Sequence, residues 1–139
     1  MSLIELTYAN TLAYCPKPLE GKVVKVYDGD TVWLACVIND TPCRVCIRMH
    51  GYDTAEMRTH DTVEKSAAIG ARDALKEMVL NKIVSLTVDG QDKYGRLIAR
   101  LTIDGLDVNK YMTDIWGVPY AGGTKQLTDW SEFPKTGSV

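Results

Sequence analysis

The chain of 139 residues is long enough for one domain with a substantial core that needs no disulfide or metal to hold it together. Charged residues make up 24% of it and hydrophobic residues 45%, which excludes intrinsic disorder, and its apolar runs are too short to cross a bilayer. A formal net charge of −2 disfavours a non-specific nucleic-acid binder but allows an enzyme that makes only a few phosphate contacts.

The first part of the chain is expected to be an N-terminal extension. Residues 1–20 contain two prolines and show no sustained periodicity. No basic region followed by an apolar stretch marks a secretory signal, so we expect an intracellular, cytoplasmic protein, with a removed signal left open. In that compartment the four cysteines are expected to be reduced.

Three β-strands are expected next, at about residues 22–27, 31–38 and 44–50. In the third, apolar and polar side chains alternate, which indicates one buried face and one exposed face. The segment Asp28-Gly29-Asp30 separates the first two strands. We expect Gly29 to allow a sharp turn, Asp28 to shape that turn, and Asp30 to point into the mouth of the fold.

The sequence from Val63 to Asn81 predicts the longest helix, because apolar side chains recur there at helical spacing. Asp61 or Thr62 is expected to cap its start, and Glu64 to complete a capping box with Asp61. The expected buried stripe consists of Ala68, Ile69, Ala71, Leu75, Met78 and Val79.

Two more strands are expected at 82–88 and 96–103, followed by a second helix near 107–115 that is capped by Asp107. This helix is expected to turn Val108, Tyr111, Met112 and Ile115 inward. From residue 119 the chain is expected to be irregular, with residues 126–139 as a C-terminal tail.

This order of elements predicts a β-barrel with helices, of the α+β class. The specific expectation is a five-stranded Greek-key barrel of the OB type with two to three α-helices, occupying residues 21–125. Such barrels often bind oligonucleotides or oligosaccharides, but a fold by itself does not define a function.

Three polar clusters stand at strand ends or in loops, at residues 28–31, 47–56 and 92–96. Each alone is typical of a turn, a cap or a hairpin. If closure of the barrel brings them together, Asp30 and Asp53 offer two carboxylates to one hard cation. The carbonyl of Thr54 and waters would complete an oxygen shell suited to Ca²⁺.

The same clusters hold groups suited to a phosphate ester. Glu56 could reach a water beside the metal, and Arg48 and Arg96 each present a planar fork that matches phosphate oxygens. Together with two metal-binding carboxylates, these are the groups that hydrolysis of a phosphodiester needs.

The motifs VYDGDTVWL, IRMHGYDTAE and DKYGRLIARL occur in order and at suitable separations. With EKSAAIGARDAL and VNKYMTDIWG, they make the stretch from Val23 to Tyr120 resemble the staphylococcal nuclease (thermonuclease-like) family. The resemblance implies a Ca²⁺-dependent nuclease on an OB barrel that cuts DNA and RNA to leave 3′-phosphate ends. It implies that Asp30 and Asp53 bind Ca²⁺ through their side chains and Thr54 through its carbonyl.

The resemblance also implies roles for the remaining site residues. Glu56 would position or deprotonate the attacking water, while Arg48 and Arg96 would hold the phosphate and stabilise its transition state. Nucleic acid would be the substrate, and neither a membrane nor an obligate protein partner is indicated. The implied substrate-binding residues are Lys93 and Tyr94, on a neighbouring phosphate, and Tyr120, near a nucleobase.

The sequence departs from the family pattern in three places. Ala55 stands where the family usually has proline, so we expect Glu56 to be less preorganised and the rate to be lower. The loop MRTHDTV is less basic than its counterpart in the family, which predicts modest, salt-dependent substrate affinity. The family's C-terminal helix is poorly matched.

Two other functions fit parts of the pattern. The alternative is a non-catalytic nuclease-like domain that binds nucleic acid or protein partners, and a third possibility is an oligosaccharide binder of the OB type. The five residues Asp30, Arg48, Asp53, Glu56 and Arg96 occur together, which neither alternative requires. Preference for DNA or RNA, endo or exo action, biological role, oligomeric state and the effect of Ala55 are left open.

Other conspicuous residues are expected to be structural. Cys43 and Cys46 form a CxxC pattern, but residues three apart on a strand face opposite sides, which disfavours zinc or redox chemistry. His50 and His60 are expected to be loop residues. Among the tryptophans, Trp33 and Trp116 are expected in the core, and Trp130 is open as a residue that stacks bases.

Overall fold

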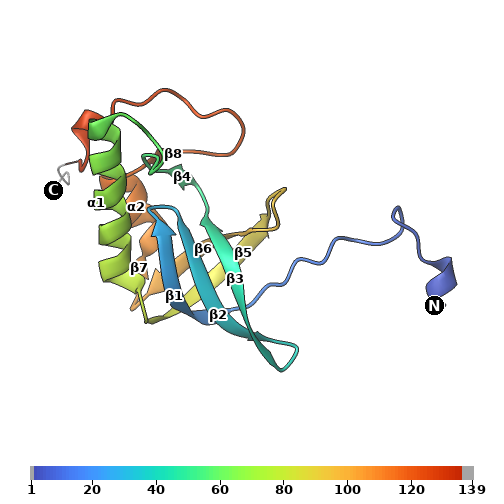
Figure 1. Cartoon of the computed structure of the whole chain (residues 1–139). Helices are drawn as coiled ribbons and strands as arrows, with labels where there is room; N and C mark the ends of the chain where they lie inside the picture. The colour runs from blue at the N-terminus through green and yellow to red at the C-terminus, as the bar shows by residue number, and fades with distance from the viewer. Residues whose placement is uncertain (1, 136–139) are drawn as a thin grey trace.

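The computed structural model describes residues 2–135, so residues 136–139 of the expected tail lie outside the described part. A five-stranded barrel forms its centre (Figure 1). Antiparallel pairing joins β1 to both β2 and β5, β2 to β3, and β5 to β6. The strands are β1 (Glu20–Asp28), β2 (Thr31–Ile38), β3 (Thr41–Met49), β5 (Ile83–Gln91) and β6 (Leu97–Ile103).

A short parallel seam closes the barrel. Residues Ile47–Met49 of β3 pair with Leu97–Ala99 of β6. This closure removes the open edges that the two strands would otherwise present. The predicted five-stranded OB-type barrel with helices is confirmed. It also places the end of β3 beside the start of β6, although they lie far apart in the sequence.

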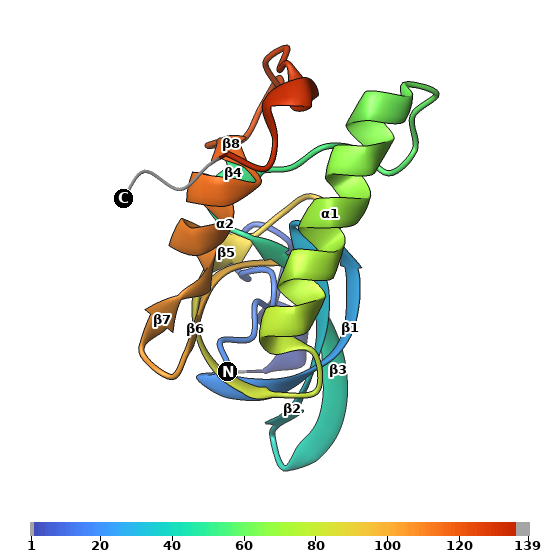
Figure 2. The ribbon, with the colours of Figure 1, turned by 90° about the vertical axis from the view of Figure 1, so that its left-hand side faces the viewer.

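Two α-helices, α1 (Thr62–Val79) and α2 (Val108–Ile115), lie on one side of the barrel. Figure 2, seen from that side, shows the two helices next to each other in front of the strands. Trp116, at the end of α2, packs so closely against α1 that a side chain at Gly70 would collide with its ring. The remaining elements are η1 (Leu3–Glu5), β4 (Tyr52–Asp53), β7 (Leu106–Asp107), β8 (Val118–Pro119) and η2 (Trp130–Glu132).

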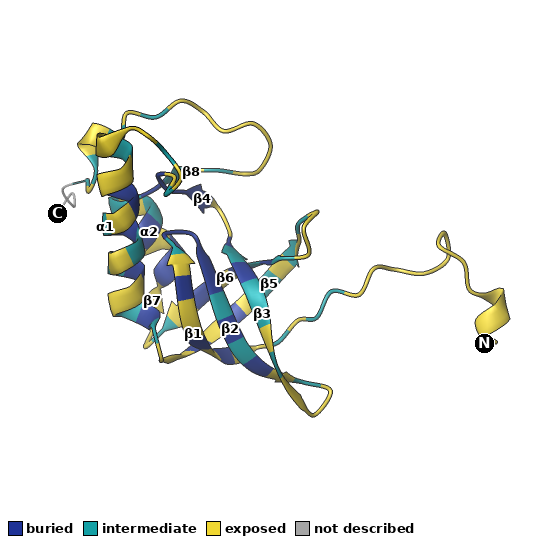
Figure 3. Ribbon diagram, viewed as in Figure 1, coloured by how far each residue is buried: buried dark blue, intermediate teal, exposed yellow. Residues whose placement is uncertain are grey.

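The core fills the barrel and the space between it and the helices. The inward faces of the strands and one face of α1 are buried, as Figure 3 shows for the helix. Burial of this apolar surface is the main source of stability. The fully buried side chains include Val23, Val32, Leu34, Ile47, Leu75, Val79, Leu101 and Met112.

Three local predictions about the helices are wrong. Ile69 is 36% exposed, because successive helical residues are turned by about 100° and Ile69 therefore faces away from the stripe through Ala68. Tyr111 is likewise 37% exposed. Asp61 caps α1 through Val63 N and Glu64 N, but the capping box does not form, because the Glu64 carboxylate accepts a hydrogen bond from Glu56 N (3.4 Å).

The ends of the chain behave differently from each other. The N-terminal segment leads away from the barrel in Figure 1, although Cys15 packs against the core. At the other end, Trp130 and Phe133 pack against Ala67 and Ala68, and Lys135 Nζ donates to Gly117 O (2.8 Å). Among residues 2–135, no helix is both long and apolar enough to span a membrane.

Candidate active site

The turn between β1 and β2 carries the first group of site residues. Asp28 Oδ1 accepts a hydrogen bond from Asp30 N (3.0 Å), so Asp28 shapes the turn as expected. The turn is present, but it does not require the left-handed backbone conformation of glycine, because Gly29 does not have a positive φ. A Cβ at this position would lie 2.7 Å from Ala71 Cβ and 2.8 Å from Thr54 Oγ1. Glycine is therefore required for close packing of the turn against α1 and the site loop.

Arg48 lies between the two carboxylates that were expected to bind a metal. Its Nη2 is 3.4 Å from Asp30 Oδ2 and 3.5 Å from Asp53 Oδ1. Its Nη1 donates to Met49 O and Tyr52 O, at 3.0 Å each. Asp30 and Asp53 are only 7% and 5% exposed, so water screens these ion pairs weakly.

Two hydroxyl groups complete the surroundings of Asp30. Thr31 Oγ1 donates to Asp30 Oδ1 (2.9 Å), and Thr54 Oγ1 donates to Asp30 Oδ2 (3.4 Å). Tyr52, which is fully buried, donates from Oη to Gly29 O (2.7 Å) and so holds the turn in place. These bonds connect the β1–β2 turn to the loop after β3.

The carboxyl groups of this cluster have different acidities. Burial and the nearby Asp30 carboxylate raise the pKa of Asp28 to about 7. Burial also raises the pKa of Asp53 to about 6, although the Lys125 ammonium opposes the shift. Burial alone would raise the pKa of Asp30, but the Arg48 guanidinium and hydrogen bonds outweigh it and hold that pKa below its ordinary value. Asp30 is thus the most acidic carboxyl group of the cluster.

Glu56 lies at the open side of this cluster with an unexpected partner. Lys125 Nζ is 2.5 Å from Glu56 Oε1 and 3.1 Å from Asp53 Oδ1. The side chain of Glu56 is 54% exposed, so it remains accessible from solvent. Lys125 therefore adds a positive group that the sequence had not indicated to the predicted Arg48, Arg96 and Lys93.

Sequence reasoning missed Lys125 because it follows an irregular segment far from the motifs. A signal was nevertheless present in the sequence "YAGGTK". The Tyr120 ring lies 5.7 Å from the Arg48 guanidinium carbon, and Tyr120 Oη donates to Gly123 O (2.6 Å). Gly122 and Gly123 both have positive φ, of 101° and 80°, which returns the chain over the cleft.

Arg96 is positioned by the hairpin between β5 and β6. Its Nε donates to Asp92 Oδ2 (2.7 Å), and Asp92 Oδ1 accepts from Tyr94 N and Arg96 N (2.9 Å each). Burial would lower the pKa of Arg96, but the bond to Asp92 raises it overall. The Tyr94 ring lies within cation–π distance of both Lys93 (5.2 Å) and Arg96 (5.8 Å). Asp92 is a second residue that sequence reasoning missed.

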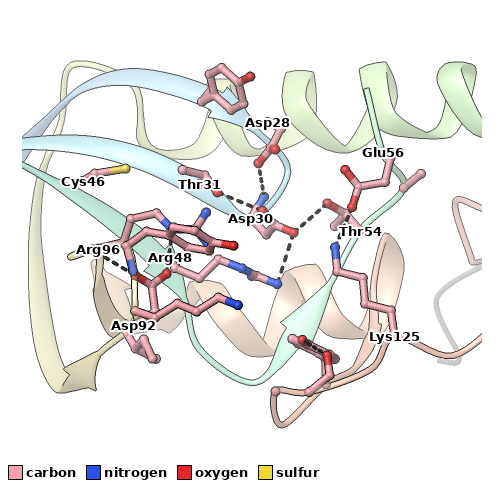
Figure 4. A pocket seen from close by; sticks show the side chains of 18 of the residues that line it. Asp28, Asp30, Thr31, Cys46, Arg48, Thr54, Glu56, Asp92, Arg96 and Lys125 are labelled. Carbon is pink, nitrogen blue, oxygen red and sulfur yellow. Dashed lines mark hydrogen bonds and ion pairs between the residues drawn. The ribbon is translucent and has the colours of Figure 1, made fainter. Parts of the chain in front are cut away.

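These groups meet at one open cleft of ≈ 950 Å³. In Figure 4, Arg48 and Asp30 lie at its centre, Asp92 and Arg96 at one end, and Glu56 and Lys125 at the other. Asp53 joins the set through its ion pairs with Arg48 and Lys125. The predicted residues that line the cleft are Asp30, Arg48, Thr54, Glu56, Lys93, Tyr94, Arg96 and Tyr120.

The donor set suits a hard cation such as Ca²⁺. Asp30 Oδ2 and Asp53 Oδ1 both face one cationic nitrogen of Arg48, so the two carboxylates converge on a position that favours positive charge. Thr54, 2% exposed, contributes oxygen beside them. No group of three or more His, Cys, Asp or Glu side chains placed to hold a metal occurs within residues 2–135, so Thr54 and water would have to complete the shell.

Trp33 differs from expectation in a way that affects the cleft, whereas the cysteines are placed as expected. Trp33, expected in the core, lies on the outer face of β2 and lines the cleft. Cys46 also lines it, whereas Cys43 faces inward opposite Cys36, and all four cysteines are free. Trp116 is partly buried against the core, and Trp130 packs on Phe133 with ring centroids 4.9 Å apart.

The fold and site define an OB-type barrel with buried carboxylates and arginines at its mouth. Residues 46–114 match the family described as staphylococcal nuclease homologue. Two proteins named "uncharacterized endonuclease", from Escherichia coli O157:H7 and Escherichia coli, are each 30% identical to the chain over 95 residues. The alignment covers 68% of this chain and 56% of each relative, so the chain spans just over half of their length. The chain belongs to the staphylococcal nuclease family, as its motifs imply.

Proposed function

We propose that the protein is a nuclease that hydrolyses phosphodiester bonds of DNA, RNA or both. The observation that carries this proposal is the meeting of Glu56, Arg48 and Arg96 at one cleft, where the Asp30 and Asp53 carboxylates both lie beside the Arg48 guanidinium. Family membership supports the same activity, and nucleic acid is the substrate that it indicates. We further propose dependence on Ca²⁺ and products with 3′-phosphate ends.

The reaction would be an in-line displacement at phosphorus. Glu56 would orient a water molecule and accept its proton as the water oxygen attacks. The bond between phosphorus and the 5′-oxygen would break, and the 5′-oxygen would take a proton and leave as a hydroxyl group, while the phosphate would stay on the 3′-oxygen. Glu56 suits this role because it is the exposed carboxylate of the cleft.

The positive groups would stabilise the charge that develops on phosphorus. Arg48 and Arg96 approach the cleft from β3 and from the β5–β6 hairpin, and each is preorganised by carboxylate or carbonyl partners. Lys125 would hold the Glu56 carboxylate in place through their ion pair. Ca²⁺, when bound by Asp30, Asp53 and Thr54, would supply a Lewis acid for a phosphate oxygen.

Contacts around Ala55 take over part of the role of the proline that the family usually has at this position. Its side chain is 4% exposed and packs with Ala67 and Ala68. Glu56 N donates to the Glu64 carboxylate (3.4 Å), which ties the loop to the start of α1. We propose that these contacts partly orient Glu56, with a lower rate than a proline would give.

Cleavage assays test the proposal. Single-stranded DNA, double-stranded DNA and RNA would be incubated with Ca²⁺, with Mg²⁺ and with chelator, and the product ends analysed. We expect cleavage with Ca²⁺ and 3′-phosphate ends, and losses of at least about 100-fold in Glu56→Gln and Arg96→Ala. Arg100→Ala, at an exposed arginine paired with Asp89 outside the cleft, is the matched control. Parent-like cleavage by Glu56→Gln would refute the assignment, and binding without cleavage would favour the non-catalytic alternative.

A further inference from the structure

We propose that a hollow beside the cleft is a second nucleotide subsite, in which a base stacks on Trp33 and a phosphate pairs with Arg44. The proposal rests on the proposed nuclease function and specifies the form of its substrate. The subsite would take single-stranded nucleic acid that continues from the scissile phosphate. Neither Trp33 nor Arg44 belongs to the set of residues proposed above to carry out hydrolysis.

The two residues lie on the outer face of the barrel. Trp33 in β2 pairs with Cys46 in β3, and Arg44 lies two residues from Cys46 on the same face. The Arg44 guanidinium carbon is 5.8 Å from the centre of the Trp33 ring. Trp33 is only partly buried, and Arg44 is exposed. A large aromatic surface is thus held at the surface by a cation rather than packed in the core.

The hollow is continuous with the catalytic cleft. It has a volume of ≈ 280 Å³ and shares Trp33, Cys46, Tyr94 and Arg96 with the cleft. Figure 4 shows Cys46 and Arg96 at the end of the cleft opposite Glu56 and Lys125. The hollow therefore extends the cleft beyond Arg96, so a strand bound at Arg96 has a direct path to Trp33.

The chemistry of this extension suits one strand of nucleic acid. Aromatic side chains beside basic groups are the usual platform for unpaired bases, because every base offers a flat face for stacking. Arg44 and Arg48 lie on one face of β3 and are four residues apart, which is roughly 13 Å on an extended strand. These two arginines can contact two non-adjacent phosphates of one strand. Bases in a duplex are stacked on each other and cannot reach Trp33, so the preference is for single strands.

Binding to oligonucleotides of two lengths tests the subsite. The probes are fluorescein-labelled thymidine dinucleotide and hexanucleotide, and a hairpin duplex, with anisotropy measured in chelator so that no cleavage occurs. The proteins are the parent, Trp33→Ala, Trp33→Phe, Arg44→Ala and the Arg100→Ala control. Arg44 is exposed, so Arg44→Ala is expected to fold and carries the test should Trp33→Ala fail to fold.

We expect Trp33→Ala to bind the hexanucleotide about tenfold more weakly than the parent, with dinucleotide affinity changed less than about twofold. Trp33→Phe should recover most of the lost affinity, and Arg44→Ala should bind the hexanucleotide about fivefold more weakly than the parent. Affinity for the hairpin duplex should be the same in the parent and in the Trp33 variants.

Equal losses of affinity for both lengths, or no loss, would overturn the subsite. Cleavage without a length-dependent loss would refute the subsite alone. A length-dependent loss without any cleavage would refute the nuclease proposal and leave the subsite standing. Absence of binding to every probe would overturn both.

Discussion

The Nζ atom of Lys125 lies 2.5 Å from Oε1 of Glu56, although the two residues are 69 positions apart in the chain. The same ammonium group lies 3.1 Å from Asp53 Oδ1. One lysine thereby compensates two carboxylates with different proposed roles, one on the attacking water and one on the cation. The segment after β8 is thus part of the site and not merely a connection to the C-terminus.

Removal of this lysine should alter the pH dependence of the reaction. Lys125 lowers the pKa of Asp53, which burial raises to about 6. In Lys125→Met that pKa should rise further, so the acidic limb of the pH–rate profile should move to higher pH and the rate at neutral pH should fall about tenfold. Lys125→Arg should restore the limb. A profile unchanged in Lys125→Met would contradict a role for the ion pairs.

Arg48 should be needed for stability as well as for catalysis. Arg48→Met leaves Asp30 and Asp53 buried without their shared partner, which should cost about 3 kcal/mol in the free energy of unfolding. Urea titration in chelator measures this loss. Replacing both carboxylates as well, by Asp30→Asn and Asp53→Asn, should recover much of it. If the triple variant were no more stable than Arg48→Met, uncompensated charge would not be the cause.

The metal-free protein should become more stable as the pH falls from 8 to 5. The folded-state pKa values of Asp28 and Asp53 are raised to about 7 and about 6, above the ordinary value of 3.8. The folded state therefore binds more protons than the unfolded state in this window, and the gain should be on the order of 2 kcal/mol. Asp28→Asn should flatten the curve. A stability that rises with pH over this window would contradict the assignment.

The same protons oppose the binding of a cation. Because Asp53 must lose its proton to act as a ligand, Ca²⁺ affinity should fall as the pH drops through 7 toward 5, with proton release on binding. Calorimetry in buffers of different ionisation enthalpy measures the released protons directly. Affinity independent of pH would indicate that Ca²⁺ binds elsewhere.

Asp92 should act through Arg96. Its carboxylate accepts from the Arg96 side chain and from two backbone amides of the hairpin. Asp92→Ala should release the guanidinium and lower kcat by about 10- to 100-fold, since small displacements of a catalytic group are costly. Because the pair is partly exposed, the free energy of unfolding should change by less than about 1 kcal/mol. A parent-like kcat would show that Arg96 needs no such partner.

Even a methyl group at position 29 should destabilise the protein. In Gly29→Ala the new methyl group meets Ala71 Cβ at 2.7 Å, which should cost about 2 kcal/mol of stability. The double variant with Ala71→Gly removes that neighbour, so a double-mutant cycle measured by urea unfolding should show coupling between the two positions. Additive effects would mean that the turn relaxes without touching α1.

Strand alternation and helical spacing were sufficient to predict the barrel and both helices, because inward and outward side chains follow regular periods. Ile69 was mispredicted because it lies about 100° around the helix from the stripe through Ala68. The capping box was mispredicted because the Glu64 side chain bonds to a tertiary neighbour, Glu56. The β1–β2 turn, the loop after β3 and the β5–β6 hairpin could be assigned to one site because three motifs mark them. Lys125 could not be assigned in the same way, since only the path of the chain brings it to the cleft. Asp92 lies within the third motif, but its bond to the Arg96 side chain could not be predicted from the motif alone.

The parallel seam that closes the barrel involves only Ile47–Met49 and Leu97–Ala99. Arg48 stands within this seam, and Arg96 directly precedes its other strand. A phosphate held by both arginines would connect the two sides of this short junction in the barrel. Bound nucleic acid would then stabilise the barrel itself, and amide hydrogens of β3 and β6 should exchange more slowly in its presence.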